Sequence, residues 1–266
     1  MTPGPTSNPF EGDGPVEIWL VVPAFRESAR IGPFLRELLP LLESEPMKSR
    51  VVVVDDGSGG PELPRLRAVL KPLQADHPGL LRLLELPVNR GKGGAVLAGW
   101  DACPACDFLA FVDADGSIGA REVARLGRMA LDRRPNDMTL FGSRVKMLGR
   151  DVGRLRWRHA SGRVFATLVS LVTGVGVYDS QCGIKIVPAA VYRAIRPVLR
   201  EQGFAFDVEL MMAVLRSGNP IEEVPIDWHE TPGGKVSFLK DPFKMFVAVV
   251  AIRRRSLKWI FSKREP

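Results

Sequence analysis

The chain has 266 residues, of which 45% are apolar and 25% charged, and its formal net charge is +7. This balance predicts one soluble globular domain with a substantial core, and it excludes the fibrous and intrinsically disordered classes. The longest run without a charged residue, 164–178, is shorter than the roughly 17–25 residues that a membrane-spanning helix needs.

The three cysteines define no disulfide framework. Cys103 and Cys106 form one CxxC pair and Cys182 stands alone, so the second pair that would complete a zinc site is missing. We interpret all three as free thiols in a reducing compartment.

Short apolar runs that end in turn residues predict strands. They lie at 16–22, 51–54, 80–84, 108–113, 138–143 and 221–226. Segments with apolar residues at helical spacing follow most of these runs and predict helices. They lie at 31–39, 63–73, directly after 89–94, 122–134 and 164–172, and a last one opens within 204–210 and continues to 215. Because strands alternate with helices, the fold class is predicted as α/β with a doubly wound, mostly parallel sheet.

Three parts are expected along the chain. Residues 1–15 are rich in proline and glycine and are expected to be a disordered lead-in, and 16–240 form the single domain. Residues 241–266 mix apolar and aromatic residues with lysines and arginines, which predicts a C-terminal amphipathic helix and a basic tail on an anionic membrane surface. Nucleic acid is less favoured as a partner, because no aromatic stacking platform accompanies the charge.

Polar loops follow four of the predicted strands. Ligands of a doubly wound sheet bind beyond the carboxyl ends of its strands, so these loops are expected to meet at one edge. They are 25–27, 55–58, 89–94 and 113–117. Neither the GxGxxG fingerprint nor the Walker pattern is present, which disfavours an NAD enzyme and a P-loop NTPase.

Two aspartates stand at the C-terminal end of the fourth predicted strand. Asp113 and Asp115 stand at i and i+2, so their side chains can point to the same side of an extended segment and share one cation. Carboxylate oxygens suit Mg²⁺ or Mn²⁺, ions that keep waters and bridge to substrate phosphates. The alternative is a turn in which both aspartates cap the following helix.

The neighbouring loops suit a nucleotide. Asp55 and Asp56 can accept hydrogen bonds from a base and a ribose, while Arg90 and Lys92 offer positive charge to a diphosphate. Each loop taken alone has a plain interpretation as a turn.

The second half of the chain holds further charged residues. Asp207 is interpreted as a helix N-cap, whereas Asp179 and Glu209 are harder to explain as caps. The segment 228–235 has glycine hinges and ends in Lys235, which predicts a mobile loop carrying a cation.

Five motifs occur in one order: PAFRE at 23–27, VDDGS at 54–58, NRGKG at 89–93, DADG at 113–116 and GSR at 142–144. Together they resemble glycosyltransferase family 2, and within it the polyprenyl-phosphate sugar synthases, which include dolichyl-phosphate mannose synthases. The segments 179–183 and 206–209 are most similar to the dolichyl-phosphate glucose synthase branch. The resemblance covers 16–250 and implies a Rossmann-like GT-A fold, a nucleotide-sugar donor, Mg²⁺ or Mn²⁺, and inversion at the anomeric carbon.

The resemblance also implies residue roles. Catalytic roles are implied for Asp115, Arg144, Arg158 and Asp179. Donor-binding roles are implied for Pro23, Phe25, Glu27, Asp55, Asp56, Arg90, Lys92, Asp113, Gln181 and Lys235. Asp113 and Asp115 would hold the metal, and Arg144 and Arg158 the phosphate of a lipid acceptor. The chain departs from the group's mannose synthases at Ser117, where they have glutamine, and it lacks the transmembrane helices of many relatives.

These features predict an inverting hexosyltransferase that moves glucose, as the favoured sugar, from a UDP-sugar to a polyprenyl or dolichyl phosphate. The acceptor oxygen is already anionic, so no strong general base is needed. The expected location is peripheral, on the cytoplasmic face of a membrane. The sequence does not decide whether the chain binds a partner protein in the membrane or forms a homo-oligomer.

Four alternatives remain. A family 2 enzyme with a sugar or protein hydroxyl as acceptor would need Asp179 or Glu209 as its base. A GDP-mannose-dependent mannosyltransferase would share the same motifs. A nucleotidyltransferase is disfavoured because no glycine-rich loop follows the first strand, and a non-catalytic nucleotide-sensing or membrane-scaffold module predicts binding without turnover.

Overall fold

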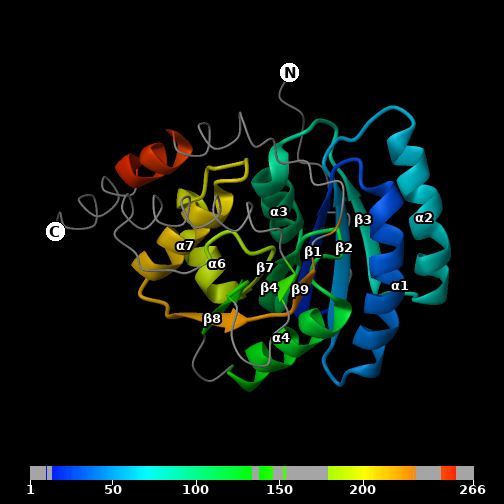
Figure 1. The fold of residues 1–266 in the computed structure, drawn as a ribbon, viewed down its shortest axis with the longest axis horizontal. Helices are drawn as coiled ribbons and strands as arrows, with labels where there is room; N and C mark the ends of the chain where they lie inside the picture. Colours follow the sequence, from blue (N-terminus) through cyan, green and yellow to red (C-terminus); the bar gives the residue numbers. More distant parts are fainter. Residues whose placement is uncertain are drawn as a thin grey trace.

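The computed structural model describes residues 10, 14–133, 138–145, 152–153, 179–229, 231 and 247–255. A seven-stranded sheet with the strand order β3-β2-β1-β4-β7-β5-β8 forms its centre (Figure 1). The strands are β1 (Val16–Ala24), β2 (Ser49–Asp55), β3 (Leu81–Glu85), β4 (Cys106–Val112), β5 (Thr139–Ser143), β7 (Ile184–Pro188) and β8 (Ile221–Pro225). A separate parallel pair joins β6 (Val152–Gly153) to β9 (Trp228–His229).

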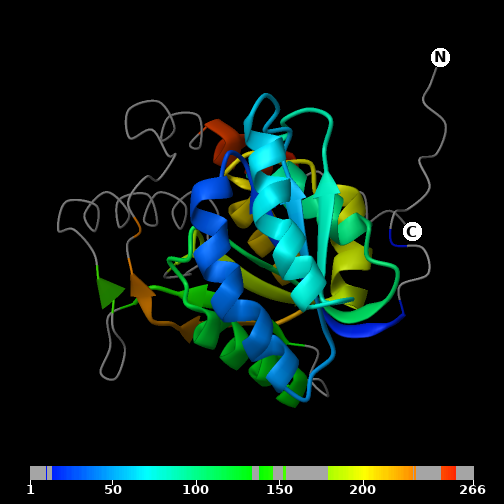
Figure 2. The same ribbon diagram turned by 90° about the vertical axis from the view of Figure 1, so that its right-hand side faces the viewer.

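Helices cover both faces of the sheet. They are α1 (Ser28–Ser44), α2 (Glu62–Asp76), α3 (Gly91–Asp101), α4 (Ala120–Asp132), α6 (Ala189–Ile195) with the 3₁₀ turn η2 (Arg196–Val198), and α7 (Phe206–Arg216). Figure 2 shows α1 and α2 side by side in front of the sheet. A further helical segment spans 247–255.

Alternating side chains of the strands build two separate cores. In β1, Ile18 and Leu20 belong to one core, which α1, α2 and α4 cover. Trp19 and Val21 belong to the other core, which α3, α6, α7 and the 247–255 segment cover. Successive residues of a strand point to opposite faces, so a continuous apolar run is what a sheet covered on both sides requires. Each such side chain contributes about 1.5–3 kcal/mol when it is fully buried.

The predicted α/β class and the mostly parallel, doubly wound sheet are confirmed. Each predicted strand is present to within a few residues, and the helices after 30, 62, 90, 120 and 206 are present as well. The helix predicted at 164–172 lies outside the described residues. Sequence reasoning missed β7 and α6, and with them the antiparallel pairing of β7 to both β4 and β5.

The ends of the domain are packed where the structure describes them. Phe10, inside the segment expected to be disordered, is 4% exposed, and its ring lies 5.3 Å from that of Trp19. In the C-terminal helical segment, Val249 and Ile252 are buried in the second core. The apolar face of this segment therefore rests on the protein itself. Among the described residues, no helix is both long and apolar enough to cross a bilayer.

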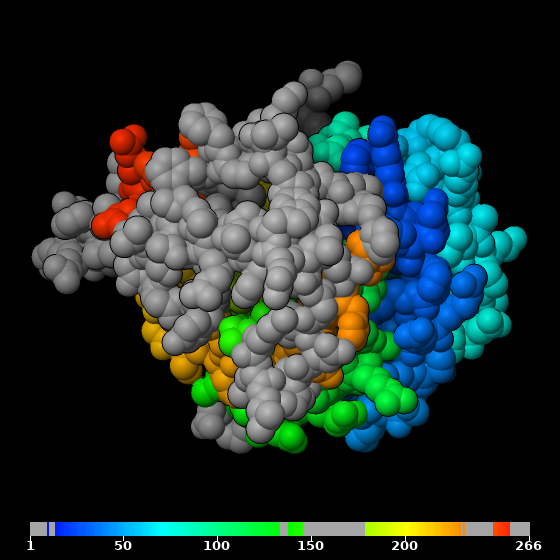
Figure 3. Space-filling model, viewed as in Figure 1, coloured from blue at the N-terminus to red at the C-terminus, as the bar shows by residue number. Residues whose placement is uncertain are grey.

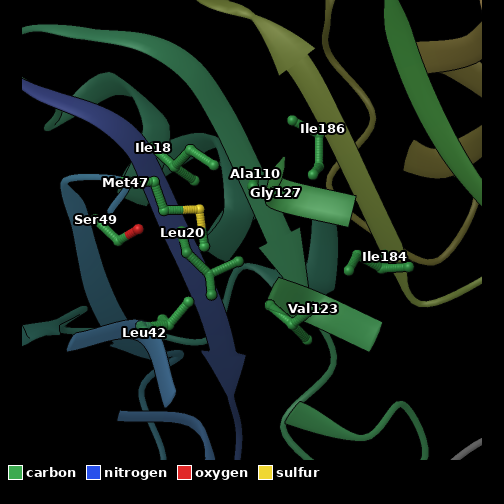
Figure 4. A pocket seen from close by; sticks show the side chains of 10 residues that line it. All are labelled: Ile18, Leu20, Leu42, Met47, Ser49, Ala110, Val123, Gly127, Ile184 and Ile186. Atoms are coloured by element: carbon green, nitrogen blue, oxygen red, sulfur yellow. The ribbon is translucent and has the colours of Figure 1, made fainter. Parts of the chain in front are cut away.

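A small cavity lies in the first core, between the sheet and helices α1 and α4. Its volume is about 10 Å³, and Figure 4 shows that its walls are mostly aliphatic side chains such as Leu20, Leu42 and Ile184. A water needs roughly this much space and at least two polar partners, so this cavity is a packing defect and no ligand site.

Candidate active site

The predicted site residues meet at one edge of the sheet. Strands β1 to β5 and β8 all run in one direction, and β7 runs against them. The carboxyl ends of the six strands therefore share an edge with the segment that enters β7. The described site residues lie in the last residues of these strands, follow the strand ends or precede β7: Pro23, Phe25, Glu27, Asp55, Asp56, Arg90, Lys92, Asp113, Asp115, Arg144, Asp179 and Gln181. Arg158 and Lys235 lie outside the described residues.

Asp113 follows β4 and contacts Lys92 in the first turn of α3. The Asp113 Oδ1 atom lies 2.9 Å from Lys92 Nζ, and the Asp113 side chain is 37% exposed. Burial raises the pKa of Asp113, the charge of Lys92 opposes this rise, and the neighbouring Asp115 adds to it. A bound cation would stabilise a carboxylate in such surroundings.

Gly183 fixes the position of Asp113. Its carbonyl accepts a hydrogen bond of 2.9 Å from the backbone N–H of Asp113. A Cβ atom added at Gly183 would lie 2.3 Å from Asp113 Oδ2, far inside van der Waals contact. The entry to β7 thus packs directly against the carboxylate, and any side chain at this position would displace it.

Asp115 lies in the turn between β4 and α4. Its Oδ1 accepts a 2.9 Å hydrogen bond from the backbone N–H of Ser117, and the Ser117 carbonyl accepts one of 3.0 Å from the N–H of His229. Figure 3 shows described residues of the β8–β9 region, in orange, against the green of the α4 region. The N-cap of α4 is Gly119, so the alternative in which both aspartates cap this helix is wrong.

Arg30 carries positive charge close to the acidic pair. Its guanidinium binds the Glu27 carboxylate, with Nη2 2.6 Å from Oε1. The hydrogen bond with Glu27 raises the pKa of Arg30, and the charge of Asp115 contributes to the rise. The Glu27 carboxylate therefore forms an ion pair with Arg30 at the site.

Asp55 and Asp56 have different surroundings. Asp55 is 1% exposed; its Oδ2 accepts a 3.0 Å hydrogen bond from Ser58 N–H, and Oδ1 has no hydrogen-bond partner among the described residues. Asp56 accepts hydrogen bonds from Asn89 Nδ2 (2.9 Å), Arg90 N–H (2.7 Å) and Gly91 N–H (2.8 Å). Asp56 therefore ties the loop before α3 to β2, a role that the sequence did not suggest.

Arg144 follows β5 and is held by Asp179. Its Nε and Nη2 donate to the two carboxylate oxygens over 2.6 and 2.7 Å, and its backbone N–H donates over 2.9 Å. Its guanidinium carbon lies 5.8 Å from the Trp228 ring centroid. Burial alone would lower the pKa of Arg144, but the charge of Asp179, its hydrogen bond and the nearby charges, including that of Asp113, together raise it.

The other predicted donor residues border the same edge. The Phe25 ring lies 5.1 Å from the guanidinium carbon of Arg26, a residue whose φ of 55° is unusual outside glycine. Arg90 is exposed, and Pro23 is partly buried within β1. The Nε2 atom of Gln181 is buried with no hydrogen-bond partner in the described part of the chain. Burial raises the pKa of the adjacent Cys182 thiol to about 12, which keeps it neutral.

Sequence reasoning missed a buried ion pair beside the site. Lys185 of β7 is 0% exposed, and its Nζ lies 2.7 Å from Asp207 Oδ1, while Asp207 Oδ2 lies 3.4 Å from Lys92 Nζ. The N-cap of α7 is Ala205, so the interpretation of Asp207 as a cap is wrong. The partner of Lys185 is distant in sequence, and no local pattern announces the pairing.

Glu209 has structural partners as well. One of its oxygens accepts hydrogen bonds from the N–H groups of Arg200 (2.7 Å) and Glu201 (2.6 Å). The other lies 2.8 Å from the guanidinium of Arg255 in the C-terminal helical segment. Glu209 thus fastens that segment to the domain.

The acidic pair suits a divalent ion that takes part of its coordination from substrate. In the described part of the chain, no three His, Cys, Asp or Glu side chains are grouped to hold a metal. Asp113 and Asp115 offer hard oxygens on one turn, which matches the way Mg²⁺ is held by one or two carboxylates together with phosphates and water. The residues therefore fit a cation that arrives with a diphosphate.

The chain is similar to known proteins over most of its length. Residues 19–194 match the family model Glycosyl transferase family 2. The dolichyl-phosphate beta-glucosyltransferase of Saccharomyces cerevisiae is 30% identical over 268 residues, which cover 97% of this chain and 80% of that protein. The human protein of the same name is 30% identical over 229 residues, covering 83% and 69% of the two chains.

Solved structures share the fold. Crystal structures of Mycobacterium tuberculosis glucosyl-3-phosphoglycerate synthase superpose with TM-scores of 0.66 and 0.65 at 17% identity, covering 91% of this chain and 80% of theirs. One of them contains Mn²⁺, uridine diphosphate and glucosyl-3-phosphoglycerate. At this identity the likeness concerns the arrangement of the sheet and its helices.

Proposed function

The chain belongs to glycosyl transferase family 2, and on this premise we propose that it transfers glucose from UDP-glucose to dolichyl phosphate or a closely related polyprenyl phosphate. The observation that carries the proposal is that the Asp113–Asp115 pair follows β4 and Arg144 follows β5, two strands whose carboxyl ends lie at the same edge of the sheet. A leaving diphosphate needs positive charge from a cation, and an attacking phosphate needs an arginine. This edge has the groups for both.

The donor side comprises β1 to β4. The nucleoside lies against Pro23 and Phe25, and the buried, unpartnered Oδ1 of Asp55 accepts a hydrogen bond from the base. Glu27 contributes through its ion pair with Arg30.

Arg90 and Lys92, near the N-terminus of α3, bind the diphosphate, where the helix dipole also favours negative charge. Asp56 acts on the donor indirectly, by holding the loop that carries Arg90.

Asp113 and Asp115 are the ligands for Mg²⁺ or Mn²⁺. The ion, when bound, supplies positive charge that stabilises the departing diphosphate. The chain itself orients the two carboxylates: Gly183 packs on Asp113, and the N–H of Ser117 holds Asp115.

The acceptor side comprises β5, β7 and β8. Arg144 binds the acceptor phosphate, with Arg158 and Lys235 proposed to complete the site. The phosphate oxygen forms a bond to the anomeric carbon while the bond from that carbon to the donor diphosphate breaks, and its electron pair leaves with the diphosphate. Attack from the opposite face inverts the configuration. No proton has to be removed, because the attacking oxygen is already anionic.

The partners of the candidate bases argue against a hydroxyl acceptor. Asp179 is occupied by the Arg144 guanidinium in a two-point contact, and Glu209 by two backbone N–H groups and Arg255. A general base needs a lone pair free to reach the acceptor hydroxyl. Asp179 is therefore a positioning residue for Arg144.

The enzyme works at a membrane surface, on the cytoplasmic face, because its acceptor is a lipid. The net charge of +7 favours contact with anionic headgroups. The part of the tail that the structure describes packs its apolar face on the domain, so attachment relies on exposed basic residues such as Arg253 and Arg254, on residues 256–266, or on a membrane partner.

One experiment tests the donor, the acceptor and turnover together. The purified protein is incubated with Mn²⁺, radiolabelled UDP-glucose and dolichyl phosphate in detergent, and label is counted in the organic extract. Parallel reactions contain dolichol without phosphate, a soluble sugar acceptor, or GDP-mannose as donor. We expect organic-soluble label only with UDP-glucose and the lipid phosphate. Label on dolichol or on the soluble sugar, label from GDP-mannose alone, or no transfer at all would each refute the proposal.

A further inference from the structure

Four alternating charges run from the interior of the sheet to the acidic pair. Lys185 lies between the rings of Phe111 and Phe141, 5.3 and 4.9 Å from their centroids, and has no solvent exposure. Next come Asp207, Lys92 and Asp113. The proposed function uses only the last two, and it gives no reason for the buried pair behind them.

The distances along this chain of charges are unequal. Lys185 contacts Asp207 at 2.7 Å and Lys92 contacts Asp113 at 2.9 Å, whereas the contact between Lys92 and Asp207 is longer, at 3.4 Å. Lys92 thus has a near carboxylate partner and a second one slightly farther away. The Asp207 side chain is 1% exposed, so the second partner is held in place.

A cation on Asp113 would share the carboxylate that Lys92 Nζ contacts at 2.9 Å, and the two positive charges would repel each other. This repulsion favours a position of Lys92 farther from Asp113 when the cation binds. We propose that Asp207 is the alternate partner that receives Lys92 at that moment, and that Lys185 is a positioning residue that holds Asp207 ready. This inference rests on the proposed function only in requiring that Asp113 and Asp115 bind a divalent cation.

The buried pair suits this task because it is fixed before the cation arrives. Asp207 is anchored through one oxygen by Lys185, which also donates a 2.5 Å hydrogen bond to the carbonyl of Cys182. Its other oxygen faces Lys92. Burial lowers the pKa of Lys92, but the charges of Asp113 and Asp207 and the hydrogen bonds to both together raise it.

The test compares Mn²⁺ affinity, with saturating UDP present, in the wild type and in the double variant K185M/D207N. This variant removes one positive and one negative charge, so the net charge near the site is unchanged while the alternate partner of Lys92 is lost. Replacing a buried ion pair by neutral groups is often close to neutral for stability, and thermal melting checks the fold. Isothermal titration calorimetry then measures the affinity. We expect Mn²⁺ to bind about tenfold more weakly.

The same change in a K92M background isolates the role of Lys92. Without Lys92 no ammonium group has to move, so K185M/D207N should then alter Mn²⁺ affinity by less than about twofold. The control is D101N/R196M, which removes an ion pair of 2.7 Å at the other end of α3 and should leave Mn²⁺ affinity unchanged.

Each failure has a distinct meaning. If the wild type binds no Mn²⁺ even with UDP present, the cation of the proposed function is refuted and this inference with it. If the wild type binds Mn²⁺ and K185M/D207N binds it equally well, only the exchange of partners is refuted. A tenfold loss that persists in the K92M background, or that D101N/R196M reproduces, also refutes the exchange, because the loss would not depend on Lys92.

Discussion

Asp56 holds three hydrogen-bond donors of the loop before α3 with a single carboxylate. Hydrogen bonds to a charged group contribute about 1.5–3 kcal/mol each when buried, and they are not additive. We expect Asp56→Ala to lower the free energy of unfolding by about 2–4 kcal/mol in urea titrations, and to raise the KM for the nucleotide sugar through the displaced Arg90.

The matched variants are Asp56→Asn and Asp76→Asn. Asp56→Asn turns an NH₂ group toward donors that need an acceptor, so it should be nearly as harmful as Asp56→Ala. Asp76 is exposed at the end of α2, and its replacement should change stability by less than about 0.5 kcal/mol. A loss below about 1 kcal/mol for Asp56→Ala would show that the loop keeps its conformation without the carboxylate.

Arg144 and Asp179 should act as one unit in catalysis. Arg144→Lys loses the planar two-point contact with Asp179, and Asp179→Asn loses the charge that orients the guanidinium. We expect each variant to lower kcat/KM at least about tenfold, and the double variant to be little worse than the more damaged single variant. Initial rates with varied acceptor phosphate measure this. A different result would identify Asp179 as a general base: the losses in kcat/KM of the two single variants multiply in the double variant, and the fall of kcat/KM at low pH disappears only in Asp179→Asn.

Sequence alone indicated the residues whose chemistry is local. The i, i+2 spacing of Asp113 and Asp115 after an apolar strand predicted the acidic pair, and the structure keeps both at one turn. Lys185 gave no such signal, because its partner Asp207 follows at the start of another helix and only the fold brings the two together. Asp56 was predicted to bind the nucleotide, and its structural role was missed for the same reason. Its three hydrogen-bond donors lie more than 30 residues farther along the chain, so no local pattern links them to it.

The segment that enters β7 controls the geometry of the acidic pair. A side chain at Gly183 would overlap Asp113 Oδ2, so we expect Gly183→Ala to weaken Mn²⁺ binding at least about tenfold and to reduce turnover in parallel. Overpacking of this kind costs about 1–3 kcal/mol of stability. Gly119→Ala is the control, because nothing lies within 4 Å of its added Cβ. Unchanged Mn²⁺ affinity in Gly183→Ala would mean that Asp113 is no ligand or can move freely.

The helical segment at 247–255 belongs to the domain as well as to the basic tail. Ile252 is 1% exposed in the second core, and Ile-to-Ala changes at such sites cost about 2–5 kcal/mol. We expect that loss for Ile252→Ala in urea unfolding, and no loss above about 0.5 kcal/mol for the exposed Arg254→Ala. If Ile252→Ala were equally harmless and reduced only the binding to anionic vesicles, the apolar face would serve the membrane.

Helices and strands were predictable where the hydrophobic pattern of one segment was enough to identify them. The buried strands of the first half read as apolar runs that alternate with helices, and this pattern predicted a mostly parallel sheet, whereas the order β3-β2-β1-β4 was observed only in the structure. β7 escaped prediction because Lys185 interrupts its short run, and its antiparallel insertion depends on partners on both sides. The 247–255 segment was assigned to a membrane because hydrophobic periodicity identifies an apolar face but does not say what covers it.

At the scale of the whole molecule, β7 separates two sets of parallel strands. The strands from β3 to β4 carry the proposed donor residues, and β5 and β8 flank the proposed acceptor residues Arg144 and Asp179. The chain of charges from Lys185 to Asp113 connects β7 and α7 to the first of these sets. The proposed donor and acceptor residues therefore lie mostly on different strands of one sheet, although the loop after β4 also contacts β9 and the entry to β7.

This division bears on how such a protein changes through descent. In the proposed assignment, substitutions around β5 and β8 would change which anion accepts the sugar and would leave the donor residues on β1 to β4 intact, so related proteins would differ in product while sharing one sugar donor. The antiparallel strand β7 pairs with β4 on one side and β5 on the other. We therefore expect its sequence to tolerate fewer substitutions than the loops on either side of it.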